Sequence, residues 1–312
     1  MENVKKMVSA TREKPQRTNK KSRFNSIYLY LLPWFIGILI FRLYPFINAI
    51  YLSLQNNNLI TDPEFIGLAN YQELLFGSTQ TGVLFRTSVM VTFRYVFLTV
   101  PLVLVFALFV AFILNFRLKG INFFRTAFYI PSILGGSVSV SIIWKFMFGN
   151  QGLVNAFLEL FGIEAVGWLV DTRFAIIVLA LLRAWQFGSV MLIFLSALQN
   201  VPVSLYEAAS IDGATKIRQF FTVTVPIITP VILFNTIQVL VNAFQEFNAA
   251  YLVSDGGPLN STLLLNLFIY RTAFNSFQMG ISSAASWIMF SIIMVFTIIL
   301  FKSSNHWVHY SD

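Results

Sequence analysis

A run of amide and carboxyl side chains lies in one apolar stretch of this 312-residue chain. Gln238, Asn242 and Gln245 are spaced by four and three residues, which places them on one face of a helix, and Glu246 and Phe247 follow directly. Amides donate to and accept from sugar hydroxyls, and aromatic rings stack on the C–H faces of a sugar. These five residues therefore form a candidate substrate path, with hydrogen bonding between helices as the alternative interpretation.

Two charged residues lie deep inside apolar stretches. Counted at 1.5 Å per residue, Arg183 lies roughly 14 Å and Glu246 roughly 11 Å from the same predicted membrane surface. Ionisable groups in a bilayer face a cavity or each other, so we expect a shielded ion pair, with a direct substrate role for Arg183 as the alternative. Further basic residues in that half of the bilayer keep an acidic oligosaccharide or a sugar phosphate open as substrate; they are Arg42, Arg94 and Lys145.

Residue types that carry covalent or metal chemistry are scarce. The chain has no Cys, and its two His residues stand near the end, at His306 and His309. It also lacks the Gly-x4-Gly-Lys-Ser/Thr phosphate loop, so we expect no ATP site of its own. The sequence thus predicts no catalytic residue and no metal site, and it gives a membrane-embedded enzyme no support.

The composition predicts an all-α polytopic membrane protein. Hydrophobic residues make up 57% of the chain and charged residues 11%, too few for a soluble surface. A bilayer core about 30 Å thick needs about 20 apolar residues in a helix, and six stretches provide them. Four of them run over residues 27–50, 174–198, 225–253 and 281–301, and the charge-free parts of the second and third cover residues 95–114 and 126–144.

The distribution of Lys and Arg predicts the orientation of these spans. A basic tail, residues 1–26, precedes the six-span domain of residues 27–302, and a short segment, 303–312, follows it. Cytoplasmic connections are enriched in Lys and Arg, so both termini are expected in the cytoplasm of a multi-pass protein of the plasma or inner membrane. The tail is expected to be disordered beside anionic lipid, and not to bind nucleic acid, because no aromatic residues interleave with its charges.

One inner connection carries a more informative pattern than the others. Residues 200–226 begin a helix-forming run at Glu207, Ala208 and Ala209, and Gly213 interrupts that run. A second run with apolar residues at helical spacing follows and is expected to end near Pro226. The pattern predicts a helix, a glycine turn and a second helix, and either a plain connection or a docking surface has this form.

The segment "YEAASIDGATKIRQFFTVTVPIITP" resembles the EAA loop of ATP-binding-cassette importer permeases, in particular the carbohydrate branch of the MalF and UgpA type. Shorter segments along the chain resemble the same family in the same order: "FIGLANYQELL", "FFRTAFYIPSI", "GLVNAFL" and "LVSDGGPLNST". The first and third of these are also amphipathic and predict short surface helices. The resemblance implies the type I importer permease fold with a cytoplasmic coupling helix.

The resemblance also implies a function and partners. The EAA loop would contact an ATPase subunit through Glu207, Ala208, Ala209, Asp212 and Gly213, and ATP and Mg would be bound by that partner. The implied partners are a second permease, two ATP-binding subunits, an extracytoplasmic solute-binding protein, membrane lipid and a carbohydrate substrate. The chain would then be a transport subunit and not an enzyme. An ion-coupled secondary transporter that works without an ATPase is the alternative.

Overall fold

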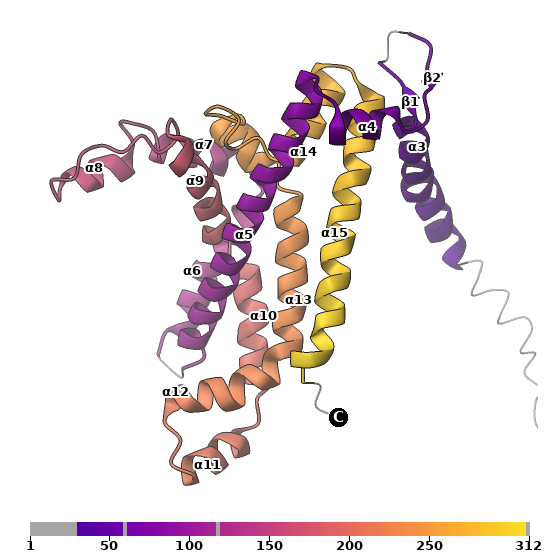
Figure 1. The fold of residues 1–312 in the computed structure, drawn as a ribbon. Coiled ribbons are helices and arrows are strands. Elements are labelled where there is room, and N and C mark those ends of the chain that lie inside the picture. The colour runs from indigo at the N-terminus through magenta and orange to yellow at the C-terminus, as the bar shows by residue number, and fades with distance from the viewer. Residues whose placement is uncertain (1–29, 59–60, 117–118, 310–312) are drawn as a thin grey trace, which may run out of the picture. The chain divides into compact units, whose positions relative to one another are not determined.

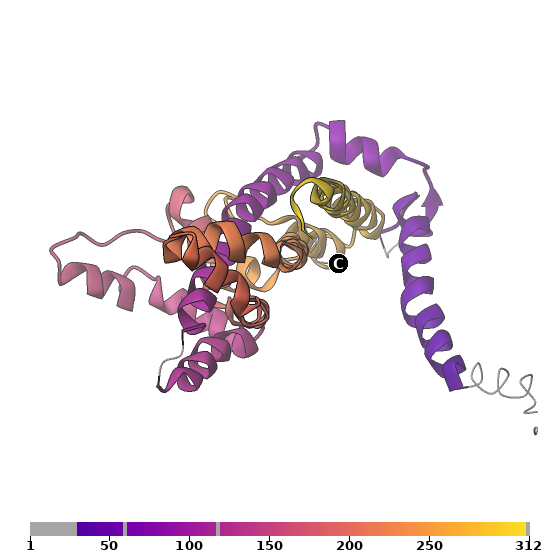
Figure 2. The same ribbon diagram turned by 90° about the horizontal axis from the view of Figure 1, so that it is seen from below.

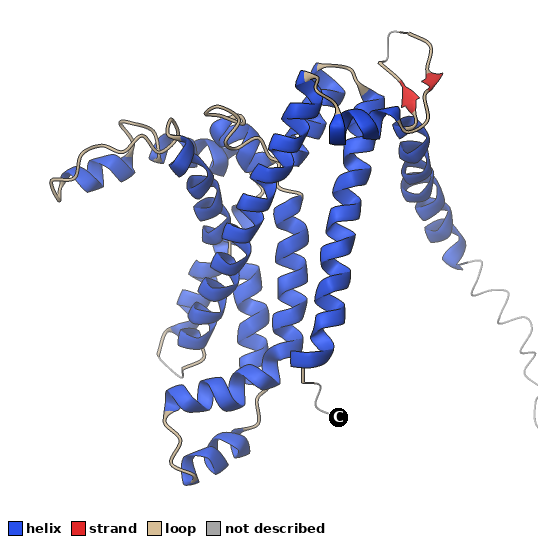
Figure 3. Ribbon diagram, viewed as in Figure 1, coloured by secondary structure: helices blue, strands red, loops and turns tan. Residues whose placement is uncertain are grey.

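The computed structural model describes residues 30–58, 61–116 and 119–309, so the predicted basic tail of residues 1–26 lies outside the described residues. Helices dominate the described part, as Figure 3 shows. A two-residue strand, β1 (Gln55–Asn56), pairs antiparallel with β2 (Glu64–Phe65). The prediction of an all-α architecture is confirmed.

The chain divides into two units, and the first, Met1–Tyr51, is described by itself. Its described part belongs to a helix, Tyr30–Ser53, that contains the π-helical turn η1 (Leu39–Leu43) and continues into α3 (Tyr44–Ser53). Large apolar side chains along it are exposed, among them Trp34 and Phe41, as expected for a helix in lipid.

The second unit, Leu52–Asp312, is organised around one long helix, α5 (Gln80–Leu114). The helices that pack against it are α4 (Ala69–Phe76), α9 (Thr172–Trp185), α10 (Gly188–Gln199), α13 (Val225–Phe244) and α14 (Leu265–Tyr270). Buried residues recur on α5 at four-residue spacing through Tyr95, Thr99, Val103 and Ala107, so one stripe of this helix faces the core. α13 packs in turn against α15 (Met279–Trp307), beside which it runs in Figure 1.

The membrane spans partly follow the six predicted stretches. Within the described residues, four helices are long and apolar enough to cross a membrane, and up to six spans result if each of two bent pairs counts as one. The second span extends beyond its predicted charge-free part of residues 95–114, because α5 begins at Gln80 and includes Arg86 and Arg94, both exposed.

The third predicted stretch is not a straight helix. It consists of α6 (Ile121–Leu134) and α7 (Val138–Met147), which meet at 102°. The glycine pair Gly135–Gly136 lies at the bend, and Ser137 accepts a hydrogen bond from Val140 N and so starts a new helix. The fourth stretch is bent by 48° between α9 and α10, at Gln186–Phe187.

The fifth predicted stretch differs at both ends. α12 (Lys216–Gln219), the π-helical turn η2 (Phe220–Thr224) and α13 form one helix through Pro226, so the predicted stop at this proline is wrong. The wide π turn just before Pro226 shifts the hydrogen-bond ladder and accommodates its ring. At its other end α13 stops at Phe244, and the chain resumes helical structure into η3 (Ala250–Ser254).

Short helices lie at both ends of this unit. α4 and the helix formed by α14 and η4 (Arg271–Asn275) lie at one end, and α11 (Val203–Ile211) and α12 lie at the other (Figure 1). The end of the chain meets the α11–α12 end, since His309 N donates to Thr229 Oγ1 over 2.9 Å. Figure 2, seen from that end, shows α11 and α12 lying across it. α4 and α8 (Leu153–Glu159) confirm the two predicted amphipathic helices.

Candidate functional site

Three interruptions in the helices of the second unit meet at one place. They are the bend at residues 135–137, the bend at 186–187 and the break at 245–247. Each interruption leaves backbone N–H and C=O groups without helical hydrogen-bond partners at membrane depth. Proteins tolerate such groups where the backbone lines a cavity or where side chains supply the missing hydrogen bonds. A small cavity of about 80 Å³ is lined by residues from all three: Gly135 and Gly136, Arg183 and Gln186, and Glu246 with Asn248.

A larger cavity of about 330 Å³ adjoins the small one and shares Gly136, Arg183 and Gln186 with it. Its walls come from α5, α6, α9, α10 and α13. The polar side chains that line it are Ser132, Arg183, Gln186, Ser189, Asn235, Gln238 and Asn242. The two cavities share lining residues and bring polar side chains together inside a largely apolar bundle, so their lining is the candidate substrate path.

Gln186 connects two of the interrupted segments. Its Nε2 donates to Gly135 O over 3.0 Å, and its Oε1 accepts from Arg183 Nη1 over 3.3 Å. The carbonyl exposed by the α6–α7 bend is therefore satisfied from α9. A Cβ atom at Gly135 would lie 2.5 Å from Gln186 Cδ, so any larger residue there would displace the Gln186 side chain.

The predicted ion pair between Arg183 and Glu246 is wrong. Within the described residues the ion pairs are Asp171–Arg173 and Asp255–Arg271. Arg183 bonds instead to Gln186, and Glu246 Oε1 accepts from Ala249 N over 3.0 Å. That last bond caps the helical segment after the break, so the carboxylate is held at a helix N-terminus and not at a cation. Both charged groups still line the same small cavity.

Four of the six residues expected in the substrate path line the cavities. Gln238 and Asn242 face the larger one from α13, and Arg183 and Glu246 line the small one. Gln245 and Phe247 line neither, because α13 ends at Phe244 and the expected helical face stops there. Gln245 is the C-cap, with its carbonyl bonded to Asn266 Nδ2, and the Phe247 ring stacks on Tyr251 at 5.3 Å.

Sequence reasoning missed Gln186, Ser189 and Ser132 as cavity residues. Ser132 is a single polar residue in an apolar run, whereas Gln186 and Ser189 follow Arg183 at three-residue spacing, a signal that could have identified them. Asn235 lines the larger cavity as well, from α13. Among the described residues, no group of three or more His, Asp and Glu side chains is placed to hold a metal ion.

The segment that resembles an EAA loop forms a helix, a turn and a second helix. α11 carries Glu207 and Ala208 in exposed positions, and Gly213 makes the turn with a φ of +74°, in the left-handed region that favours glycine. The turn is fixed by Gln219, whose Nε2 donates to Ser210 Oγ over 2.8 Å and to Ala214 O over 3.1 Å.

This helix–turn–helix exposes large apolar side chains. Ile211 is 87% exposed, Ile217 74% and Phe221 65%. Ile211 directly precedes the exposed Asp212, and the segment lies at one end of the second unit (Figure 2). An ordered, apolar surface of this kind is typical of a contact site for another protein.

Interrupted spans around a polar cavity, with an ordered helix–turn–helix at one end, are the features of a membrane transport subunit. The family model described as binding-protein-dependent transport system inner membrane component matches residues 74–309. The chain belongs to this family, and its resemblance to ATP-binding-cassette permeases is confirmed.

Curated relatives support the assignment over nearly the whole chain. The probable ABC transporter permease protein YesP of Bacillus subtilis (strain 168) is 46% identical over 91% of this chain and 92% of its own length. The trehalose/maltose transport system permease protein MalF of Thermococcus litoralis is 32% identical over 88% of this chain and 92% of its own length. The sn-glycerol-3-phosphate transport system permease protein UgpA of Escherichia coli is 32% identical over 91% of this chain and 95% of its own length.

A solved structure shares the fold. A chain in the crystal structure of a bacterial alginate ABC transporter, in complex with an alginate pentasaccharide-bound periplasmic protein, matches with a TM-score of 0.78. The match covers 93% of this chain and 97% of that one, at 20% sequence identity. The importer permease fold expected from the resemblance is therefore confirmed.

Proposed function

We propose that this chain is the permease subunit of an ATP-driven sugar or oligosaccharide importer, with the two adjoining cavities as its substrate path. The observation that carries the proposal is the polar lining of the larger cavity by Gln186, Gln238 and Asn242, within an apolar bundle. Amides suit neutral hydroxyl groups, and a volume of about 330 Å³ is within the size of small-ligand sites.

The names of the relatives favour the same substrate class. They include permeases for starch degradation products, for arabinooligosaccharides and for trehalose and maltose. A charged substrate remains a second candidate on a specific observation, because Arg183 lines both cavities and a cation there would bind a uronate or a phosphate. The Glu246 carboxylate in the small cavity would repel such an anionic substrate.

We propose that α11 and the turn at Gly213 couple this chain to an ATPase subunit. Glu207, Ala208, Ala209 and Asp212 would contribute to that contact, and the exposed Ile211 would add apolar area. The rigid connection of α12 through η2 into α13 supports this role. Since α13 carries Gln238 and Asn242, a movement imposed on the turn reaches the cavity along one continuous helix.

The transport cycle proposed here is alternating access without covalent chemistry. Two similar permeases would enclose the path, and two ATPase subunits that bind ATP and Mg would close it at one end. A solute-binding protein would deliver the sugar at the other. The solved alginate transporter, described with its periplasmic protein, supports the last partner. In this assembly both termini and α11 face the cytoplasm, as the Lys and Arg distribution indicates.

Uptake of labelled oligosaccharides into proteoliposomes tests the proposal. The chain would be reconstituted with its partner permease and ATPase subunits, and the loaded binding protein would be added outside. We expect uptake that requires internal ATP and that falls by about tenfold or more in Asn242→Leu, which removes an amide from the cavity wall. Ser286→Ala, on α15 and outside both cavities, is the matched control. Uptake by the chain alone, driven by an ion gradient, would instead show an ion-coupled transporter.

A further inference from the structure

A separate cleft of about 500 Å³ opens at the end of the second unit opposite α11 and α12. It lies between the start of α5, the end of η3, the loop of residues 255–264 and the helix formed by α14 and η4. It shares no lining residue with the two cavities of the substrate path. Its polar lining includes Tyr251, Asp255, Asn260, Arg271, Asn275 and Gln278.

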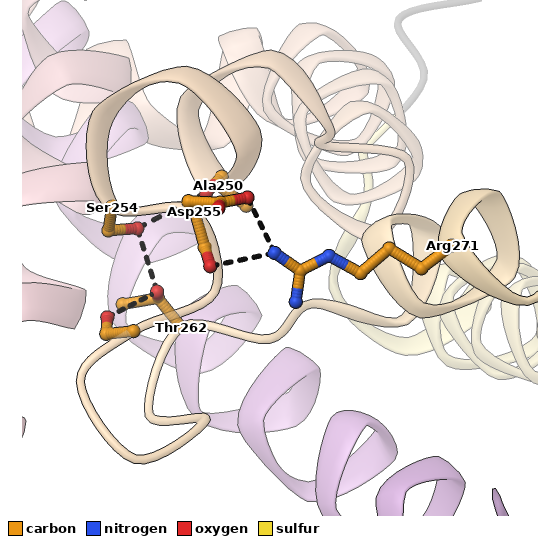
Figure 4. Close-up of polar contacts among 6 residues, drawn as sticks. Ala250, Ser254, Asp255, Thr262 and Arg271 are labelled. Atoms are coloured by element: carbon orange, nitrogen blue, oxygen red, sulfur yellow. Dashed lines mark hydrogen bonds and ion pairs between the residues drawn. The ribbon is translucent and has the colours of Figure 1, made fainter. Parts of the chain in front are cut away.

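The wall of this cleft is held in place by a set of bonds (Figure 4). Arg271 Nη2 donates to the backbone oxygen of Asp255 over 2.9 Å and to its Oδ1 over 2.5 Å. Ser254 Oγ bonds to Thr262 Oγ1 over 2.7 Å, and Thr262 Oγ1 donates to Gly257 O over 2.7 Å. Asp255 has a positive φ of 47°. A non-glycine residue in this region costs free energy, so the bonds from Arg271 hold an otherwise unfavourable conformation.

Several polar groups in the cleft have no partner in the described part of the chain. Arg271 donates to Asp255 through Nη2 alone. Its Nε and Nη1 form no hydrogen bond with the described residues. The same holds for the side-chain amides of Asn260, Asn275 and Gln278, which line the cleft. These groups place donors and acceptors around one concave space, as a ligand with several hydroxyl groups requires.

An aromatic surface completes the cleft on one side. The Tyr251 ring is 39% exposed and lines the cleft, while Phe247 stacks on it at 5.3 Å and an interplanar angle of 18°. Phe247 directly follows Glu246, which lines the small cavity of the substrate path. The exposed part of the Tyr251 ring thus gives the cleft an aromatic surface on which a sugar ring stacks, one short stretch of chain away from Glu246.

We propose that this cleft is an outer saccharide subsite, which holds the trailing units of an oligosaccharide whose leading unit lies in the inner cavities. The inference rests on the proposed function and adds a second binding site to it. Tyr251 supplies a stacking surface, and Asn275, Gln278 and the unused donors of Arg271 bind hydroxyl groups. The Asp255–Arg271 pair balances the charge of the cleft, which makes it suited to neutral saccharide units.

Chain-length dependence of transport tests the subsite. In the complete complex, with saturating loaded binding protein, initial uptake rates would be compared for a disaccharide and a pentasaccharide of the same glucose series. We expect Asn275→Ala and Tyr251→Leu to lower the pentasaccharide rate about tenfold and to change the disaccharide rate less than twofold. Leu259→Ser is the matched control, since Leu259 is 90% exposed on the same loop and lies outside the cleft lining.

The other outcomes are decisive as well. Equal loss for both sugars, together with weaker binding of the loaded binding protein to the complex, would overturn the proposal and make the cleft a protein-docking surface. Unchanged rates for both sugars would overturn it while leaving the proposed transport function intact. Failure of any sugar to enter the unmodified complex would contradict the proposed function itself. Because Tyr251 packs against Phe247, the exposed Asn275 keeps the test independent of folding.

Discussion

Glu246 shows how one side chain can serve the fold and the path together. Its Oε1 caps the helical segment after the break by accepting from Ala249 N, and the same side chain lines the small cavity that contains Arg183. The capping bond needs only an acceptor oxygen, whereas electrostatic selection of the substrate needs the charge. Substitution by glutamine therefore separates the two roles, because the amide oxygen still accepts from Ala249 N.

We predict that Glu246→Gln shifts selectivity toward acidic saccharides. Removal of a negative charge from the cavity should raise the ratio of uronic to neutral oligosaccharide uptake by about tenfold, or roughly 1.4 kcal/mol. The measurement is the ratio of initial uptake rates in the reconstituted complex. Glu159→Gln, an exposed carboxylate on α8 outside both cavities, should leave this ratio unchanged. An unchanged ratio in Glu246→Gln itself would show that Glu246 acts as a helix cap alone.

At the scale of the element, composition predicts the apolar stretches but not their bends. At the bend between α6 and α7, Gly135 lies so close to Gln186 that a Cβ would be 2.5 Å from Gln186 Cδ. Similarly, a Cβ at Gly188 would lie 2.5 Å from Phe128 O on α6. These contacts join segments 51 and 60 residues apart, so neither stretch encodes its bend alone. The helical spacing of Gln238 and Asn242 predicted their shared face because α13 is regular there, and it failed at Gln245, where the helix ends.

We predict that Gln219 keeps the helix–turn–helix rigid enough to transmit force. Gln219 is 2% exposed, and its Nε2 joins Ser210 on α11 to Ala214 in the turn. Gln219→Leu removes both bonds, at about 1 kcal/mol each, while conserving the buried volume. We expect the sugar transported per ATP hydrolysed to fall several-fold, with the complex still assembled.

The matched control for this variant lies on the same short helix. Arg218 is exposed, and only its backbone N–H bonds to Thr215 Oγ1, over 3.4 Å, so Arg218→Gln should keep the transport ratio. If Gln219→Leu also kept that ratio, the turn would need no internal bracing and the role assigned to Gln219 would be wrong. Gel filtration of both variants with the ATPase subunits separates loss of coupling from loss of assembly.

For the molecule as a whole, the absence of Cys makes its sidedness directly measurable. The two ends of the second unit differ in their chemistry. The α11–α12 end exposes Ile211 and also holds the bond between His309 and Thr229, while the opposite end carries the cleft and the exposed Leu259. The Lys and Arg distribution predicts which end faces the cytoplasm. The fold does not depend on that orientation, but the proposed coupling to an ATPase does.

We predict that single cysteines at these two ends react from opposite sides of the membrane. Leu259→Cys should be labelled by a membrane-impermeant maleimide on intact cells, and Ile211→Cys only after the membrane is permeabilised. Both positions are at least 87% exposed, so accessibility of the side chain does not limit the reaction. Co-expression of the ATPase subunits should then protect Ile211→Cys and leave Leu259→Cys reactive, since Ile211 lies beside Asp212 and Gly213 in the proposed contact. Labelling of Ile211→Cys on intact cells would reverse the orientation, and unchanged labelling with the ATPase present would remove α11 from the coupling contact.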